Sequence, residues 1–240
     1  VGYFYLAHLY RKLEIQQFFQ EKTKDRKFTF SPELVNRFLT YARILDPDSK
    51  LGSLEKMNHF FEEPDFDYQH ILRTMDLMEN YDDYIAYLFH ASNKVVKRNT
   101  AVCYYDCTNY YCEAESADED YTDPITGEVL TGLRQYGLAK DHKPNPLVEM
   151  GLFMDTNGIP ISMCITPGNA NEQTTVLPLE KELIRMFGDK KNKFIYCADA
   201  GLGSYHIRSY NAMGGRAFIV TQSIKKLSDK LKEAVFNDFE

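Results

Sequence analysis

Two aspartates that stand in apolar, strand-like segments are the residues best suited to chemistry in this sequence. Asp106 lies within the apolar and aromatic run 102–111, and Asp199 ends the apolar run that begins at Lys193. A carboxylate is costly in such surroundings unless a metal, a cation or hydrogen-bond donors stabilise its charge. Two strands that each bring one aspartate to a shared sheet edge therefore predict a site for a divalent metal ion.

The chemistry expected of such a pair is in-line phosphoryl transfer on nucleic acid. Neighbouring carboxylates repel unless a cation is present, and Mg²⁺ prefers oxygen ligands while keeping positions for water and phosphate oxygens. With two ions bound, one activates a water or a 3′-hydroxyl and the other stabilises the leaving oxygen. We therefore expect Mg²⁺, with Mn²⁺ as a substitute, at Asp106 and Asp199. The alternative is two unrelated polar residues at strand ends.

The elements that hold this pair follow from the hydrophobic periodicity. Residues 1–98 show the apolar spacing of helices, with a good helix start at Ser31-Pro32. The Asn157-Gly158 turn between two apolar runs predicts a β-hairpin, and the acidic, turn-rich stretch 113–137 reads as a loop excursion. From about residue 99 the pattern predicts strands at 102–111, 147–155, 161–166, 193–199 and 216–221, and helices at 174–187, 204–213 and 225–240.

This order predicts a mixed α/β fold preceded by an all-α N-terminal region. Strand–helix–strand units imply parallel pairing with right-handed crossovers. A five-stranded sheet with three antiparallel strands followed by two parallel ones, flanked by helices, is the arrangement of a ribonuclease-H-like core. We therefore predict a helical region at 1–98 and such a core at 99–240, with the strand 102–111 buried on both faces.

Bulk composition limits the functional classes. The net charge of −7 argues weakly against nucleic-acid binding, since phosphate contacts usually come from a basic surface, although a binding site is local. No apolar run approaches the roughly 20 residues that span a bilayer, so no membrane partner is expected. The five cysteines lie mostly in apolar segments, which favours reduced thiols over disulfides.

Four segments carry a resemblance to a known family: Tyr105-Asp106-Cys107-Thr108, Cys197-Ala198-Asp199-Ala200-Gly201, 137–144 and 158–169. Together they resemble the DDE transposases of bacterial insertion sequences, in particular the insertion sequence four superfamily, over about residues 100–223. The resemblance implies that Asp106 and Asp199 are catalytic metal ligands. It also implies strand cleavage by water and strand transfer by a 3′-hydroxyl at transposon ends.

The same resemblance implies double-stranded DNA as partner, a homodimer in the DNA complex, and a bacterial cytoplasmic protein that is nucleoid-associated when bound to DNA. The basic residues Lys140, His142 and Lys143 are candidates for phosphate contacts, with a solvated loop as the alternative. Thr108 and Asn109 are candidates to support Asp106, and His206 is a weaker candidate near Asp199.

The sequence departs from the family at the third carboxylate, which the family carries in a Tyr-x2-Arg-x3-Glu-x6-Lys pattern beyond an inserted β-rich domain. Tyr205 and Arg208 match the start of this pattern by chance, because Ala212 stands at the glutamate position. Glu233 is a minor candidate for the third ligand. Since the chain starts at Val1 and stops in charged sequence, we expect a fragment truncated before the true glutamate and inactive alone.

Two other functional classes stay open. One is a non-catalytic DNA-binding or domesticated module derived from a transposase, and the other is a stand-alone ribonuclease-H-like nuclease. Fold alone does not choose among the three. A longer reading frame with a downstream glutamate in the family pattern favours the transposase.

Overall fold

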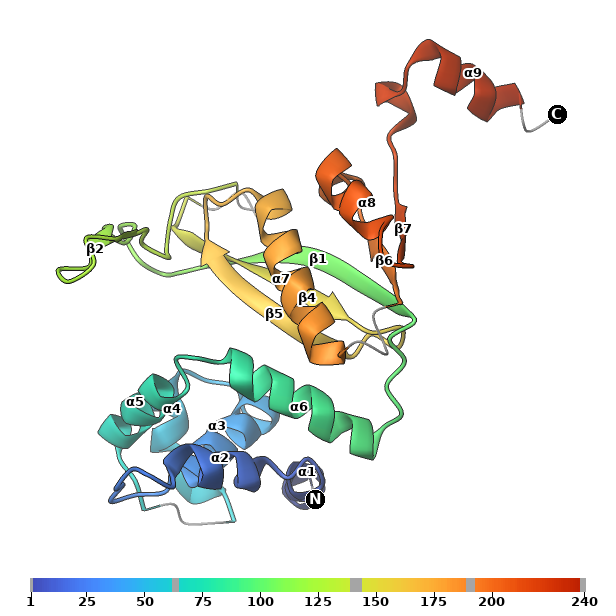
Figure 1. The fold of residues 1–240 in the computed structure, drawn as a ribbon. Helices are drawn as coiled ribbons and strands as arrows, with labels where there is room; N and C mark the ends of the chain where they lie inside the picture. The colour runs from blue at the N-terminus through green and yellow to red at the C-terminus, as the bar shows by residue number, and fades with distance from the viewer. Residues whose placement is uncertain (1, 62–64, 139–143, 189–192, 238–240) are drawn as a thin grey trace. The chain divides into compact units, whose positions relative to one another are not determined.

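The computed structural model describes residues 2–61, 65–138, 144–188 and 193–237 (Figure 1). The chain forms two compact units, Val1–Arg98 and Asn99–Glu240. Within the described ranges, no helix combines the length and the apolar character needed to cross a membrane.

The first unit is built from helices. Ser31 Oγ accepts the Leu34 N–H at 3.2 Å and Pro32 occupies the first helical turn, so the third helix begins where the sequence predicts. The helices are α1 (Gly2–Lys12), α2 (Ile15–Thr23), α3 (Pro32–Leu45), α4 (Lys50–Glu55), α5 (Tyr68–Leu77) and α6 (Asp82–Val95), with a 3-10 turn, η1, at Met57–His59.

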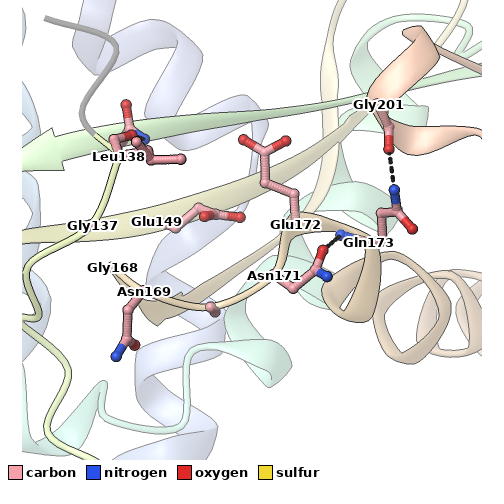
Figure 2. A pocket seen from close by; sticks show the side chains of 11 residues that line it. Gly137, Leu138, Glu149, Gly168, Asn169, Asn171, Glu172, Gln173 and Gly201 are labelled. Carbon is pink, nitrogen blue, oxygen red and sulfur yellow. Dashed lines mark hydrogen bonds between the residues drawn. The ribbon is translucent and has the colours of Figure 1, made fainter. Parts of the chain in front are cut away.

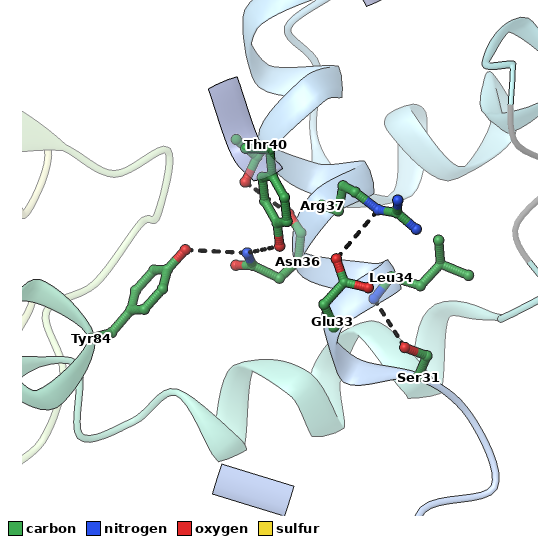
Figure 3. Close-up of polar contacts among 8 residues, drawn as sticks. Ser31, Glu33, Leu34, Asn36, Arg37, Thr40 and Tyr84 are labelled. Atoms are coloured by element: carbon green, nitrogen blue, oxygen red, sulfur yellow. Dashed lines mark hydrogen bonds and ion pairs between the residues drawn. The ribbon is translucent and has the colours of Figure 1, made fainter. Parts of the chain in front are cut away.

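A partly buried polar contact joins three of these helices (Figure 3). The Asn36 side chain on α3 donates to Tyr10 Oη on α1 at 3.1 Å and to Tyr84 Oη on α6 at 3.2 Å. Burial raises the pKa of both phenols. Aromatic side chains, including Phe18, Phe19 and Tyr41, fill the core around this contact, which accounts for the many aromatic residues in this half of the sequence.

The second unit contains the predicted five-stranded mixed sheet. Its order is β5-β4-β1-β6-β7; β4 is antiparallel to β1 and β5 to β4, whereas β6 is parallel to β1 and β7 to β6. This is the order and direction of a ribonuclease-H-like core, so the predicted fold class is confirmed. The strands are β1 (Val102–Tyr111), β4 (Leu147–Met154), β5 (Pro160–Pro167), β6 (Ile195–Ala198) and β7 (Ala217–Val220).

Helix α7 (Glu172–Phe187) connects β5 to β6, α8 (Tyr205–Asn211) connects β6 to β7, and α9 (Asp229–Asn237) follows β7. The described residues of this unit also include the 3-10 turns η3 (Ala200–Leu202) and η4 (Ile224–Lys226). α7 covers one face of the sheet, and its Thr175 Oγ1 lies 2.7 Å from Tyr105 Oη on β1. α8 packs beside it, since Asn211 Nδ2 donates to Glu180 Oε2 on α7 at 3.0 Å.

The prediction that β1 is buried on both faces is wrong. Cys103, Tyr105 and Cys107 are buried, whereas Tyr104 is 39% exposed and Asp106 is exposed as well. Side chains alternate between the two faces of a strand, and α7 covers the face that holds the odd-numbered residues. The even- and odd-numbered residues of this strand both include aromatic side chains, so the sequence does not indicate which face is covered. All five cysteines are thiols rather than members of disulfides.

The hairpin predicted at Asn157-Gly158 is confirmed. β4 and β5 flank a turn in which Gly158 has φ +76°, a region that glycine occupies without the steric cost that a Cβ brings. The buried Asp155 Oδ1 accepts the N–H groups of Asn157 and Ile159, both at 2.9 Å.

Residues 113–137, the predicted loop excursion, contain some regular structure. It carries a short antiparallel pair, β2 (Tyr121–Thr122) and β3 (Val129–Leu130). At the tip, Asp123 Oδ1 accepts the Ile125 N–H at 2.7 Å. At the base, Arg134 Nε donates to Asp118 Oδ1 at 2.7 Å, and this contact lowers the pKa of Asp118. We call residues 118–134 the arm.

Candidate metal centre

Strand pairing places Asp106 and Asp199 side by side. Tyr105 on β1 is paired with Ala198, the last residue of the parallel strand β6, so each aspartate directly follows one member of this pair, on strands that lie about 4.8 Å apart. Tyr105 and Tyr196 are buried on the face that α7 covers. Because side chains alternate, Asp106 and Asp199 both belong to the opposite face, and both are exposed.

The two carboxylates differ in how the chain holds them. Asp106 stands in the middle of β1, paired across to Leu152 of β4, and its Oδ1 accepts the Cys107 N–H at 2.8 Å. Asp199 stands at the N-terminal cap of η3, and its Oδ1 accepts the Ala200 N–H at 2.6 Å and the Thr221 hydroxyl at 2.8 Å. One carboxylate is held by a strand and the other by a turn.

The donor set suits a hard divalent cation, because both side chains offer exposed carboxylate oxygens on one face. It contains two carboxylates. Among the residues that the structure describes, no group of three or more His, Cys, Asp and Glu side chains is placed to hold a metal ion. Glu233 is exposed on α9, and none of the nine described residues of that helix is buried. The structure thus does not bring Glu233 to the aspartate pair.

The described weaker candidates have different surroundings. Asn109 belongs to the α7 face of β1, opposite to Asp106, and its Nδ2 donates to the Leu138 carbonyl at 3.2 Å. Thr108 shares the face of Asp106, two residues further along the strand. His206 is exposed on α8, where its ring lies 6.0 Å from that of Tyr205. Lys140, His142 and Lys143 lie outside the described residues.

Sequence reasoning missed a pocket of about 500 Å³ at the N-terminal end of α7 (Figure 2). The carboxylates of Glu149 and Glu172 point into it, and Glu149 is only 4% exposed. Asn171 caps α7 by accepting the Gln173 N–H at 3.0 Å. Glu149 could have been noticed from the same signal as Asp106, a single carboxylate within an apolar strand.

Two carboxylates of the pocket act electrostatically on the buried Cys107 thiol. Burial raises the pKa of Cys107 to about 12, and the negative charges of Glu149 and Glu172 act in the same direction. A thiol with a raised pKa is protonated at neutral pH, and the thiolate is the nucleophile and metal ligand. Cys107 is therefore a protonated, buried thiol on the α7 face.

Comparisons with known proteins return only distant structural likenesses. No protein-family model matches the chain, and no curated protein sequence matches it. The solved structures that match include the Mos1 mariner paired-end complex with Mn, at a TM-score of 0.33 and 11% identity over 83% of this chain and 65% of that one.

Two further structures match at a similar level. The Mos1 transposase paired-end complex with left transposon end has a TM-score of 0.32 and 13% identity over 87% of this chain and 57% of that one. A pre-cleavage Mos1 transpososome has a TM-score of 0.32 and 14% identity over 87% and 58%. The chain thus spans less than two thirds of the length of each of these structures.

Proposed function

We propose that the second unit carries the first two metal ligands of a DDE transposase of the insertion-sequence type, which cuts and joins DNA at transposon ends. The observation that supports the proposal is the pairing of Tyr105 on β1 with Ala198 on β6, since Asp106 and Asp199 directly follow these two residues. The motifs around these two residues, rather than the distant structural likenesses, support the choice of family.

In this proposal each part of the chain has a defined task. Asp106 and Asp199 bind divalent ions, Mg²⁺ or Mn²⁺, through their exposed oxygens. Two such ions, when bound, supply the activation of a water or a 3′-hydroxyl and the stabilisation of the leaving oxygen. β1 fixes the position of Asp106, and the turn after β6 fixes that of Asp199.

The partners follow from the same proposal. The substrate is double-stranded DNA, with a homodimer assembled on the transposon ends in the bacterial cytoplasm. Lys140, His142 and Lys143 are proposed to contact DNA phosphates, which would offset the unfavourable net charge of −7. Because phosphate contacts release counterions, DNA affinity should fall as salt concentration rises.

The test is Mn²⁺ binding by calorimetry to the full chain and to Asp106→Asn and Asp199→Asn. We expect the wild-type chain to bind and both variants to lose binding, because each removes half of the donor set. Asp229→Asn is the matched control, since Asp229 is a fully exposed carboxylate on α9 of the same unit. Binding that survives both site substitutions would show that the two aspartates do not share a site.

A cleavage assay separates the proposal from its rivals. We expect the chain alone to bind DNA and to cleave it weakly, because two carboxylates do not complete the site. Robust metal-dependent cleavage by this chain would favour a stand-alone nuclease. Salt-sensitive DNA binding with no Mn²⁺ binding at the aspartates would favour a non-catalytic DNA-binding module.

A further inference from the structure

The turn that carries Asp199 is hydrogen-bonded to a side chain of the sheet. Tyr196, fully buried on β6, donates its hydroxyl to the Leu202 carbonyl at 3.1 Å. The Leu202 N–H in turn donates to the Asp199 carbonyl at 3.0 Å. These two hydrogen bonds close the turn 199–202 on its own strand and fix the backbone on which the Asp199 side chain stands.

The same turn is also hydrogen-bonded to a side chain of α7. Gln173, in the first turn of that helix, donates its Nε2 to the Gly201 carbonyl at 2.7 Å. Figure 2 shows this contact beside the pocket. A helix that precedes β6 in the chain therefore holds the turn that follows β6, and the backbone of the turn is restrained from two directions.

The Asp199 carboxylate itself is oriented by a residue from a third element. Thr221 follows β7, the edge strand, and its hydroxyl donates to Asp199 Oδ1 at 2.8 Å. The same oxygen accepts the Ala200 N–H at 2.6 Å. Two donors that approach one oxygen from different parts of the chain restrict rotation of the carboxylate about its Cβ–Cγ bond.

We propose that Thr221 is a positioning residue for Asp199, through which the edge strand β7 sets the direction in which this carboxylate presents its oxygens to a metal ion. The inference rests on the proposed function, because it assigns Thr221 a task only if Asp199 binds metal. Thr221 and Asp199 are both exposed, so their hydrogen bond contributes little to folding stability. Groups that orient metal ligands nevertheless alter metal affinity by roughly 10- to 100-fold.

The test uses three substitutions in the full chain. Thr221→Val keeps the shape and removes the hydroxyl, whereas Thr221→Ser keeps the hydroxyl and removes a methyl group. Thr122→Val is the matched control, because Thr122 is exposed on β2 in the same unit. Two quantities are measured for each protein: the NMR shifts of the Asp199 carboxyl carbon and Ala200 amide without metal, and Mn²⁺ affinity by calorimetry.

We expect Thr221→Val to shift both NMR signals and to weaken Mn²⁺ binding by about 10-fold, while Thr221→Ser and Thr122→Val stay close to wild type. Unchanged NMR signals in Thr221→Val would overturn the inference, as would an unchanged Mn²⁺ affinity despite moved signals. Moved signals in a chain whose wild type binds no Mn²⁺ would support the positioning of Asp199 by Thr221 and contradict the proposed function. The two claims can therefore fail separately.

Discussion

The two faces of the sheet differ in burial, and β1 contributes side chains to both. On the face under α7, Tyr105 of β1 is 2% exposed and its hydroxyl lies 2.7 Å from Thr175 Oγ1. On the other face, Asp106 is exposed beside Asp199. Alternation along β1 thus separates the core side chains from the proposed metal ligand residue by residue, so substitutions on the two faces should be distinguishable by what they change.

The largest expected effect compares two adjacent tyrosines. Tyr105→Ala should lower the free energy of unfolding by about 3–5 kcal/mol, because it removes a large aromatic side chain from the core. Tyr104→Ala, on the half-exposed side, should cost about 1 kcal/mol. Urea unfolding followed by the NMR amide signals of β1 measures both. Equal losses would show that the two faces are not packed differently.

The second prediction concerns a buried carboxylate on the α7 side. Glu180 is fully buried, and burial raises its pKa to about 7 against the opposing effects of Asn211 and Arg216. A carboxyl whose pKa is higher in the folded than in the unfolded state favours folding when protonated. Its contribution is complete below the unfolded pKa near 4.5 and is lost as pH rises through about 7, a change of roughly 3 kcal/mol.

Glu180→Gln should remove this change, so that the variant loses less stability than wild type between pH 5 and pH 8. Glu182→Gln is the control on the same helix, since the Glu182 side chain is 44% exposed. Urea midpoints at the two pH values give the comparison. An identical pH dependence in wild type and Glu180→Gln would show that Glu180 does not titrate with folding.

The third prediction tests how closely the α7 face is packed. A Cβ at Gly151 would lie 2.3 Å from Tyr105 Oη and 3.1 Å from Cys164 Sγ. Gly151→Ala should therefore cost about 1–3 kcal/mol through overpacking. Gly201→Ala is the control, because a Cβ there meets nothing within 4 Å. Thermal unfolding of both variants tests this, and equal melting temperatures would contradict it.

The smallest effect isolates one hydrogen bond on the same face. Tyr105→Phe keeps the ring and removes the hydroxyl that meets Thr175, so we expect a loss of about 1 kcal/mol. Mn²⁺ affinity should not change, because the ring and the register of β1 are retained. A loss of metal binding in Tyr105→Phe would show that the two faces are coupled and would contradict the separation described above.

The sequence predicts the elements of the sheet better than their surroundings. The long run 102–111 and the Asn157-Gly158 turn carry strong local signals, and the structure has β1 and the β4–β5 hairpin there. The side of β1 that is covered depends on where α7 packs, which is tertiary information. The strands of the arm contain two residues each, too few for an alternation pattern to be detected.

For the candidate site, too, the sequence predicts what depends on local signals but not what depends on tertiary contacts. Asp106 and Asp199 stand out because each is a single carboxylate in an apolar segment, and their adjacency follows from the predicted fold. The contact from Thr221 to Asp199 joins residues 22 positions apart and depends on the parallel pairing of β6 and β7. No local sequence pattern therefore predicts it. The roles of Lys140, His142 and Lys143 stay predictions.

The contact between Asp118 and Arg134 at the base of the arm implies that the arm tolerates insertions and deletions, whereas β1 does not. Because the arm leaves and rejoins the unit at one closed point, residues added or removed between 119 and 133 need not shift β1 or β4. One residue inserted within β1 ahead of Asp106 would instead turn that aspartate under α7 and bring Tyr105 out. Relatives of this chain should therefore vary in length in the arm and keep the length of the strand.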